Sequence, residues 1–82
     1  MSSREYKEIQ VLEFLNKYIK AHHGFAPSYR EIMESCGITS SSVVKFYLDH
    51  LEKDQLIGHM WGRARAIYIT EAGYEQLRAR VS

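Results

Sequence analysis

Apolar residues recur at helical spacing through the first quarter of the sequence. The stripe is made by Tyr6, Ile9, Leu12, Leu15 and Ile19, joined by Val11, Phe14 and Tyr18. Intervals of three and four residues put these side chains on one wide face, which predicts a helix over residues 3–22. Because Pro27 disfavours helical backbone in the residue before it, residues 24–27 are expected to run extended and to form a short edge strand.

A second helix is predicted to begin after Ser28. Ser28 followed by Glu31 is the pattern of a capping box, in which each side chain accepts a hydrogen bond from an otherwise unpaired backbone N–H. The apolar positions of this helix are Tyr29, Ile32, Met33 and Cys36. Gly37 suits the left-handed residue that often closes a helix, so the helix is about two turns long.

The third helix is predicted over residues 41–53, and the short connection before it has helix-turn-helix spacing. Thr39, Ser40 or Ser41 can cap it, and we favour Ser40. At about 100° per residue, one face carries Val44, Tyr47, Leu48 and Leu51. The opposite face carries Ser42, Lys45, Phe46 and Asp49. Phe46 is therefore expected to point away from the core.

Two short runs and a last helix complete the pattern. Residues 56–60 and 65–70 are joined by a turn-compatible Gly62 and predict a hairpin. Thr70 can cap a final helix, in which Gly73 is expected to weaken the first turn. Its narrow apolar seam is formed by Tyr74, Leu77 and Val81. The seam can serve as an interface between two copies or can pack on the first helix.

Length and composition bound these interpretations. The 82 residues are expected to form one domain, 1–82, and 45% hydrophobic with 26% charged residues is typical of a globular protein. No apolar run approaches the ~20 residues needed to cross a bilayer, so we expect a cytoplasmic protein with no membrane partner. A net charge of +1 does not by itself indicate nucleic-acid binding.

The predicted element order is that of a winged helix-turn-helix. The fold class is mainly α with a small β-hairpin: a three-helix core, a wing over about residues 58–66, and a C-terminal helix. The sequence also resembles the DNA-binding domain of LexA-type repressors, through "GFAPSYREIMESCGITSSSVVKFYLDHLEKDQLI" followed by "RAIYIT". The matching features are Gly24, Pro27-Ser28, Glu31-Ile32, Gly37, the serine-rich turn, Leu48-x-x-Leu51 and the strand after the wing.

The chain departs from the family pattern at three points. Gln55 stands where the family usually has glycine, so a residue less suited to left-handed backbone must close the turn after the third helix. Lys45 and Phe46 replace polar positions of the recognition helix, which leaves the DNA sequence undetermined. The family's self-cleaving C-terminal domain is absent from this sequence, so the resemblance does not carry over cleavage-driven derepression.

The resemblance and the helix-turn-helix spacing together predict sequence-specific binding of double-stranded DNA by a repressor-like transcriptional regulator. The recognition helix, about residues 41–53, would enter the major groove, which admits a helix. The predicted base-contacting residues are Ser40, Ser42, Val43, Lys45 and Phe46. The predicted backbone-contacting residues are Ser28, Tyr29, Arg30, Thr39, Ser41, Lys53, Arg63 and Arg65. We expect a homodimer, at least on DNA, because one recognition helix contacts only a half-site.

Other functions are less well supported by the sequence. Adjacent His22 and His23 cannot both face one site on a regular helix, and Cys36 lies on an apolar stripe, so no metal site is expected. No nucleophile elbow or phosphate-cradling glycine loop is present, so we expect no enzymatic activity, no cofactor and no small-molecule ligand. The alternative function is that of a winged-helix protein–protein interaction module, because the fold does not dictate the partner.

Overall fold

The computed structural model describes residues 3–59 and 67–81. Its elements, in order, are α1 (Ser3–Ala21), α2 (Tyr29–Cys36), α3 (Ser41–Lys53), β1 (Ile57–His59), β2 (Ile67–Ile69) and α4 (Glu71–Val81). The two strands pair in an antiparallel hairpin. This arrangement confirms the predicted winged helix-turn-helix class, mainly α with a small hairpin.

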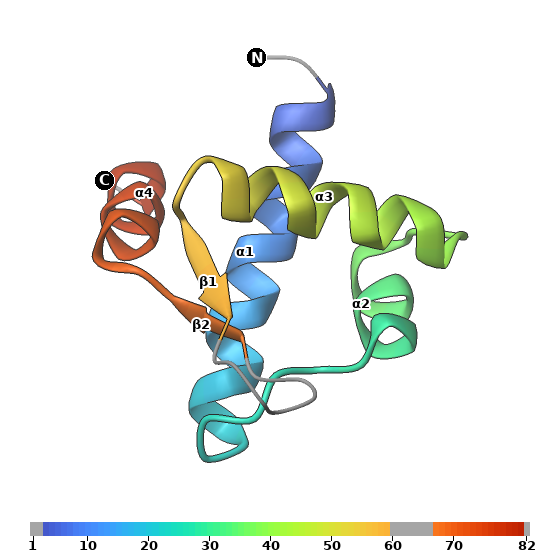
Figure 1. Ribbon diagram of the computed structural model, residues 1–82, viewed down its shortest axis with the longest axis horizontal. Coiled ribbons are helices and arrows are strands. Elements are labelled where there is room, and N and C mark those ends of the chain that lie inside the picture. Colours follow the sequence, from blue (N-terminus) through green and yellow to red (C-terminus); the bar gives the residue numbers. More distant parts are fainter. Residues whose placement is uncertain (1–2, 60–66, 82) are drawn as a thin grey trace.

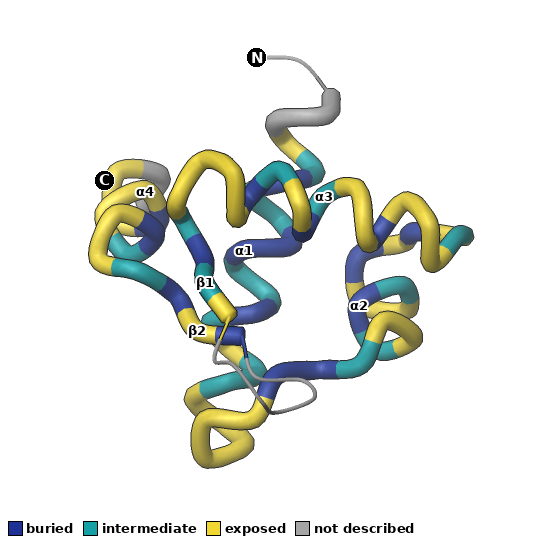
Figure 2. Tube along the Cα trace, viewed as in Figure 1, coloured by how far each residue is buried: buried dark blue, intermediate teal, exposed yellow. Residues whose placement is uncertain are grey.

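Helix α1 is the central element of the fold. It contacts α2, α3, α4 and β2, with α2 and α4 on opposite sides of it in Figure 1. Val11, Leu12 and Leu15 lose all their solvent exposure, and Figure 2 shows buried residues along the middle of this helix. Burying an apolar side chain of this size stabilises a fold by about 1.5–3 kcal/mol, so α1 organises the core that holds the other elements in place.

The expected edge strand at residues 24–27 is wrong. The described strands pair only with each other, and the connection from α1 to α2 has no strand pairing. Pro27 cannot donate to a ladder, and Ala26 and Pro27 are instead buried. Ala26 and Pro27 therefore pack against the core, and the extended backbone that Pro27 favours does not pair with a neighbouring strand.

The caps of α2 form as predicted. The Glu31 N–H donates to Ser28 Oγ over 3.2 Å, and the Ser28 N–H donates to Glu31 Oε1 over 2.7 Å, which confirms the capping box. Gly37 closes the helix with φ of 66°, in the left-handed region that glycine adopts without strain. Cys36, in the last turn, is buried, and this burial raises the pKa of its thiol.

Helix α3 follows the predicted projection. Ser40 caps it by accepting a hydrogen bond from the Ser42 N–H over 3.2 Å, which confirms the favoured cap. The inner face is buried at Val44, Leu48 and Leu51. Because these three side chains fix the rotation of α3 about its axis, the opposite face of the helix must point to solvent.

The turn after α3 bears out the expectation drawn from Gln55. Gln55 has a φ of 62°, so a residue with a side chain occupies the left-handed region. The turn is held by the Leu56 N–H, which donates to the Leu51 carbonyl over 2.9 Å, and by the Thr70 hydroxyl, which donates to the Gln55 carbonyl over 2.6 Å. These bonds offset part of the strain and fix where the hairpin begins.

The hairpin leaves α3 with Ile57 opposite Ile69 and His59 opposite Ile67. Ile57, Ile67 and Ile69 are buried, so one face of the hairpin closes the core. The predicted turn at Gly62 lies outside the described residues.

Helix α4 packs on the hairpin and on α1. The Gly73 N–H donates to the Thr70 hydroxyl over 3.0 Å, which confirms Thr70 as the cap. Gly73 does more than weaken the first turn, because a Cβ there would lie 2.2 Å from the Leu56 carbonyl oxygen. Its missing side chain is what lets α4 approach the hairpin this closely.

The apolar seam of α4 packs inside the molecule. Leu77 is buried and Tyr74 is half-buried against the core, while the side chain of Val81 lies outside the described part. Of the two predicted uses of this seam, packing on the first helix is therefore the one observed.

Candidate nucleic-acid interface

The outer face of α3 exposes most of the predicted base-contacting residues. Ser42, Val43, Lys45 and Phe46 are all exposed, with Val43 at 39% and Phe46 at 44% of full exposure. Ser40 is half-buried, and its hydroxyl oxygen serves as the cap of the helix. The face therefore offers a hydroxyl group, an ammonium group and apolar surface, within two helical turns of the start of α3.

Lys45 is not free on this face. Its Nζ donates to Asp49 Oδ2 over 2.9 Å, one helical turn further on, with the two side chains 64% and 61% exposed. The hydrogen bond and the negative charge of Asp49 raise the pKa of Lys45, so the ammonium stays protonated. Because both side chains are exposed to solvent, the pair is weak, and a base edge or a phosphate can compete with Asp49 for Lys45.

Phe46 has aromatic neighbours on its own helix. Its ring centroid lies 4.4 Å from that of His50 and 5.7 Å from that of Tyr47. His50 approaches α1, where its Nδ1 lies 3.8 Å from Glu8 Oε1. Phe46 is therefore connected to α1 through two contacts, first with His50 and then from His50 to Glu8.

The predicted backbone-contacting residues occupy three separate places. Tyr29 and Arg30 are exposed in the first turn of α2, next to the half-buried cap Ser28. Thr39 and Ser41 are exposed at the start of α3. Lys53 is exposed at the opposite end of that helix, and Arg63 and Arg65 lie outside the described residues.

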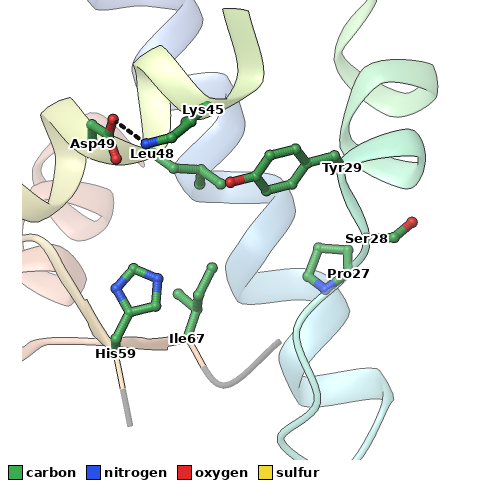
Figure 3. Close-up of a pocket in the computed structure, with 8 residues that line it drawn as sticks. All are labelled: Pro27, Ser28, Tyr29, Lys45, Leu48, Asp49, His59 and Ile67. Carbon is green, nitrogen blue, oxygen red and sulfur yellow. Dashed lines mark hydrogen bonds and ion pairs between the residues drawn. The ribbon is translucent and has the colours of Figure 1, made fainter. Parts of the chain in front are cut away.

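A pocket of about 380 Å³ brings the first of these places against α3. Figure 3 shows the pocket between α2, the outer face of α3 and the hairpin. Its lining residues are Pro27, Ser28, Tyr29, Lys45, Leu48, Asp49, His59 and Ile67. The pocket joins predicted backbone-contacting residues, Ser28 and Tyr29, to a predicted base-contacting residue, Lys45. These three residues therefore lie on one continuous surface.

His59 is a surface residue that the sequence analysis did not select. It lines the pocket from the hairpin, and its Nδ1 lies 2.5 Å from Glu52 Oε2 of α3. Residues two apart in a strand share a face of the sheet. Because Ile57 faces the core, His59 lies on the same face of the hairpin, on the side toward α3. That alternation is the signal in the sequence that indicates its position.

The described part of the chain shows neither a metal-binding cluster nor a membrane-spanning helix. Among residues 3–59 and 67–81, no group of three or more histidine, cysteine, aspartate or glutamate side chains is placed to hold a metal ion. Within the same ranges, no helix is both long and apolar enough to span a bilayer.

Comparison with known families and proteins agrees with the fold and the exposed helix. A family model described as the LexA DNA binding domain matches residues 4–66. The chain belongs to the LexA DNA-binding domain family. This match covers α1, α2, α3 and β1, which are the elements that build and support the exposed face of α3.

Individual proteins similar to this chain include two that are named LexA repressor. The LexA repressor of Leuconostoc citreum (strain KM20) is 35% identical over 79 residues, which cover 94% of this chain and 37% of that protein. The LexA repressor of Clostridium botulinum (strain Hall) is 41% identical over 69 residues, covering 84% of this chain and 34% of that protein. The chain therefore spans about a third of the length of the curated relatives it matches.

Proposed function

We propose that this chain binds double-stranded DNA in a sequence-specific manner and acts as a transcriptional regulator of the repressor type. The observation that carries the proposal is the outer face of α3, whose exposed side chains are held outward by the buried Val44, Leu48 and Leu51. Membership of the LexA DNA-binding domain family supports DNA as the partner. The printed name of the relatives, LexA repressor, supports repression as the outcome.

In the proposed complex α3 lies in the major groove. A helix with its side chains is about 10–12 Å across, and the groove is about 12 Å wide. Lys45 would donate to an acceptor such as guanine O6 or N7, and Ser42 can donate to or accept from a base edge. Val43 and Phe46 would meet apolar base atoms, of which the thymine methyl is the most prominent. Ser40, the N-cap of α3, lies at the N-terminal end of this face.

The remaining predicted residues would hold the DNA backbone. Exposed Tyr29 and Arg30 begin α2, where the unpaired N–H groups and the positive end of the helix dipole favour a phosphate. Tyr29 lines the pocket together with Lys45, so a phosphate bound there would lie next to the bases that α3 is proposed to read. Backbone contacts of this kind set the register of the protein on DNA without reading sequence.

The proposal extends to assembly and location. One recognition helix contacts one half-site, and two-fold pairing on half-sites about 34–36 Å apart is the common arrangement of helix-turn-helix proteins. We therefore propose a homodimer on DNA. Because the proposed partner is double-stranded DNA, we propose that the chain acts in the cytoplasm.

The experiment is a selection of bound fragments from random double-stranded DNA, followed by binding titrations at several salt concentrations. DNA binding through several phosphates should give an enriched motif and an affinity that falls steeply as salt rises. A chain that enriches no motif, and whose association is insensitive to salt, would instead support the protein–protein interaction module. Footprints of the selected DNA should show two half-sites, and a single unpaired half-site would contradict the homodimer.

A further inference from the structure

We infer that His50 is a positioning residue that holds the Phe46 ring for apolar contact with a thymine methyl group, and that Glu8 anchors His50 to α1. This inference rests on the proposed DNA binding and adds to it the identity of the groups that support one base contact. It concerns a contact chain across two helices: Glu8 on α1, then His50 and Phe46 on α3.

The first step is the placement of the two rings on α3. Residues four apart on a helix lie on the same side, and helical side chains lean toward the N-terminus. His50 therefore leans back over position 46, and the two ring centroids lie 4.4 Å apart with 53° between the planes. Tyr47 meets Phe46 from another side, with centroids 5.7 Å apart and an interplanar angle of 65°. Phe46 is thus supported on two sides and still 44% exposed.

The second step is the anchor of His50. Glu8 is only 8% exposed, although it carries a carboxylate, and its Oε1 lies 3.8 Å from His50 Nδ1. This separation is within the range of electrostatic attraction when the imidazole is protonated. The His50 ring therefore lies against the helix that organises the core, beside a largely buried carboxylate.

The third step is the consequence for binding. An exposed phenylalanine without support would sample several rotamers, and fixing one of them on binding costs free energy. A ring already held between His50 and Tyr47 meets its target without that cost. The apolar target in the major groove is the thymine methyl, because the other base-edge groups exposed there are hydrogen-bond donors and acceptors. Loss of His50 should therefore weaken methyl recognition and leave phosphate contacts unchanged.

The test uses the preferred duplex selected by the wild-type chain, with each thymine replaced in turn by deoxyuridine. This replacement removes only the methyl group. At one position the wild type should bind the thymine duplex about fourfold more tightly than the deoxyuridine duplex, which is the effect expected of burying one methyl group. Phe46→Ala and His50→Ala should each bring this ratio close to one, and their combination should lower it no further. His50→Phe, which keeps a ring, should restore more of the ratio than His50→Gln.

Matched variants separate positioning from folding. His22→Ala is the control, because His22 also stacks on an aromatic ring, that of Tyr18, with the ring centroids 3.8 Å apart. This pair lies at the C-terminal end of α1, away from α3, so His22→Ala should leave the ratio unchanged. Glu8→Gln should give a ratio between those of the wild type and His50→Ala, and a wild-type ratio would overturn the role of Glu8. Binding to random duplex reports folded protein, so it should be the same for all variants.

Two failures can be told apart. A wild type that prefers no duplex overturns the proposed function, and this inference with it. A wild type that prefers its selected site, but whose thymine-to-uracil ratio is one at every position or is unaffected by His50→Ala, overturns the inference alone.

Discussion

Replacing Gly73 by alanine is expected to destabilise the protein, although alanine is the stronger helix former. In the interior of a helix this change normally gains roughly 0.5–1 kcal/mol. Here an added Cβ would lie 2.2 Å from the Leu56 carbonyl oxygen and 2.8 Å from Ile69 Cγ2. A carbon normally stays about 3.3–3.6 Å from a carbonyl oxygen, so something must move by about 1 Å.

The atoms in the way are poorly able to move. The Leu56 carbonyl accepts a hydrogen bond from the Thr70 N–H over 3.1 Å, and Ile69 is buried in the hairpin. Inserting a methyl group into such a site costs about 1–3 kcal/mol, and two fixed obstacles place Gly73→Ala at the upper end. After subtraction of the helix-propensity gain, the free energy of unfolding should fall by roughly 2 kcal/mol.

The assay is thermal unfolding followed by circular dichroism. For a domain of this size each kcal/mol lowers the Tm by about 4–8 °C, so Gly73→Ala should lower it by roughly 8–16 °C. Ala72→Gly, at the exposed neighbouring position, is the control for helix propensity and should cost only about 0.5–1 kcal/mol. A Gly73→Ala chain that is as stable as the wild type, or more stable, would refute the close packing of α4 on the hairpin.

Three further substitutions probe α3 and its turn. Leu51→Ala should lower the free energy of unfolding in urea by about 2–5 kcal/mol, because Leu51 is buried. Phe46→Ala should lower it by less than about 1 kcal/mol, and equal losses would contradict the rotation of α3. Gln55→Gly should raise the urea midpoint by relieving the left-handed φ, and a lower midpoint would show that the side chain of Gln55 contributes more than its strain costs. Asp49→Asn should strengthen binding to random duplex at low salt, because it releases Lys45 from the ion pair with Asp49. An unchanged affinity would mean that this ion pair does not restrain Lys45.

The features that the sequence predicted correctly depend on residues close together in the chain. The capping box of Ser28 and Glu31, the cap at Ser40 and the left-handed Gly37 each involve backbone groups within a few residues. The outward direction of Phe46 follows from helical periodicity alone. Such local rules hold because the competing conformations of a short segment are few.

The features that the sequence did not predict depend on contacts between distant segments. Nothing near Gly73 in the sequence indicates that the Leu56 carbonyl will lie against it. The extended residues around Pro27 looked like a strand, but a strand needs a partner, and the hairpin pairs only with itself in the described structure. The contact between Glu8 and His50 joins positions on two helices, and periodicity cannot specify which polar groups meet across a helix pair.

The central claim is that the outer face of α3 reads bases. The most direct measurement is a titration of the wild type, Lys45→Ala and Ser42→Ala against the selected duplex and its single-base variants, at several salt concentrations. Each substitution should lower discrimination by ~1–3 kcal/mol at one base position, while binding to random duplex is largely retained. If both variants keep the full site preference of the wild type at every position, α3 does not read the bases and the account is contradicted.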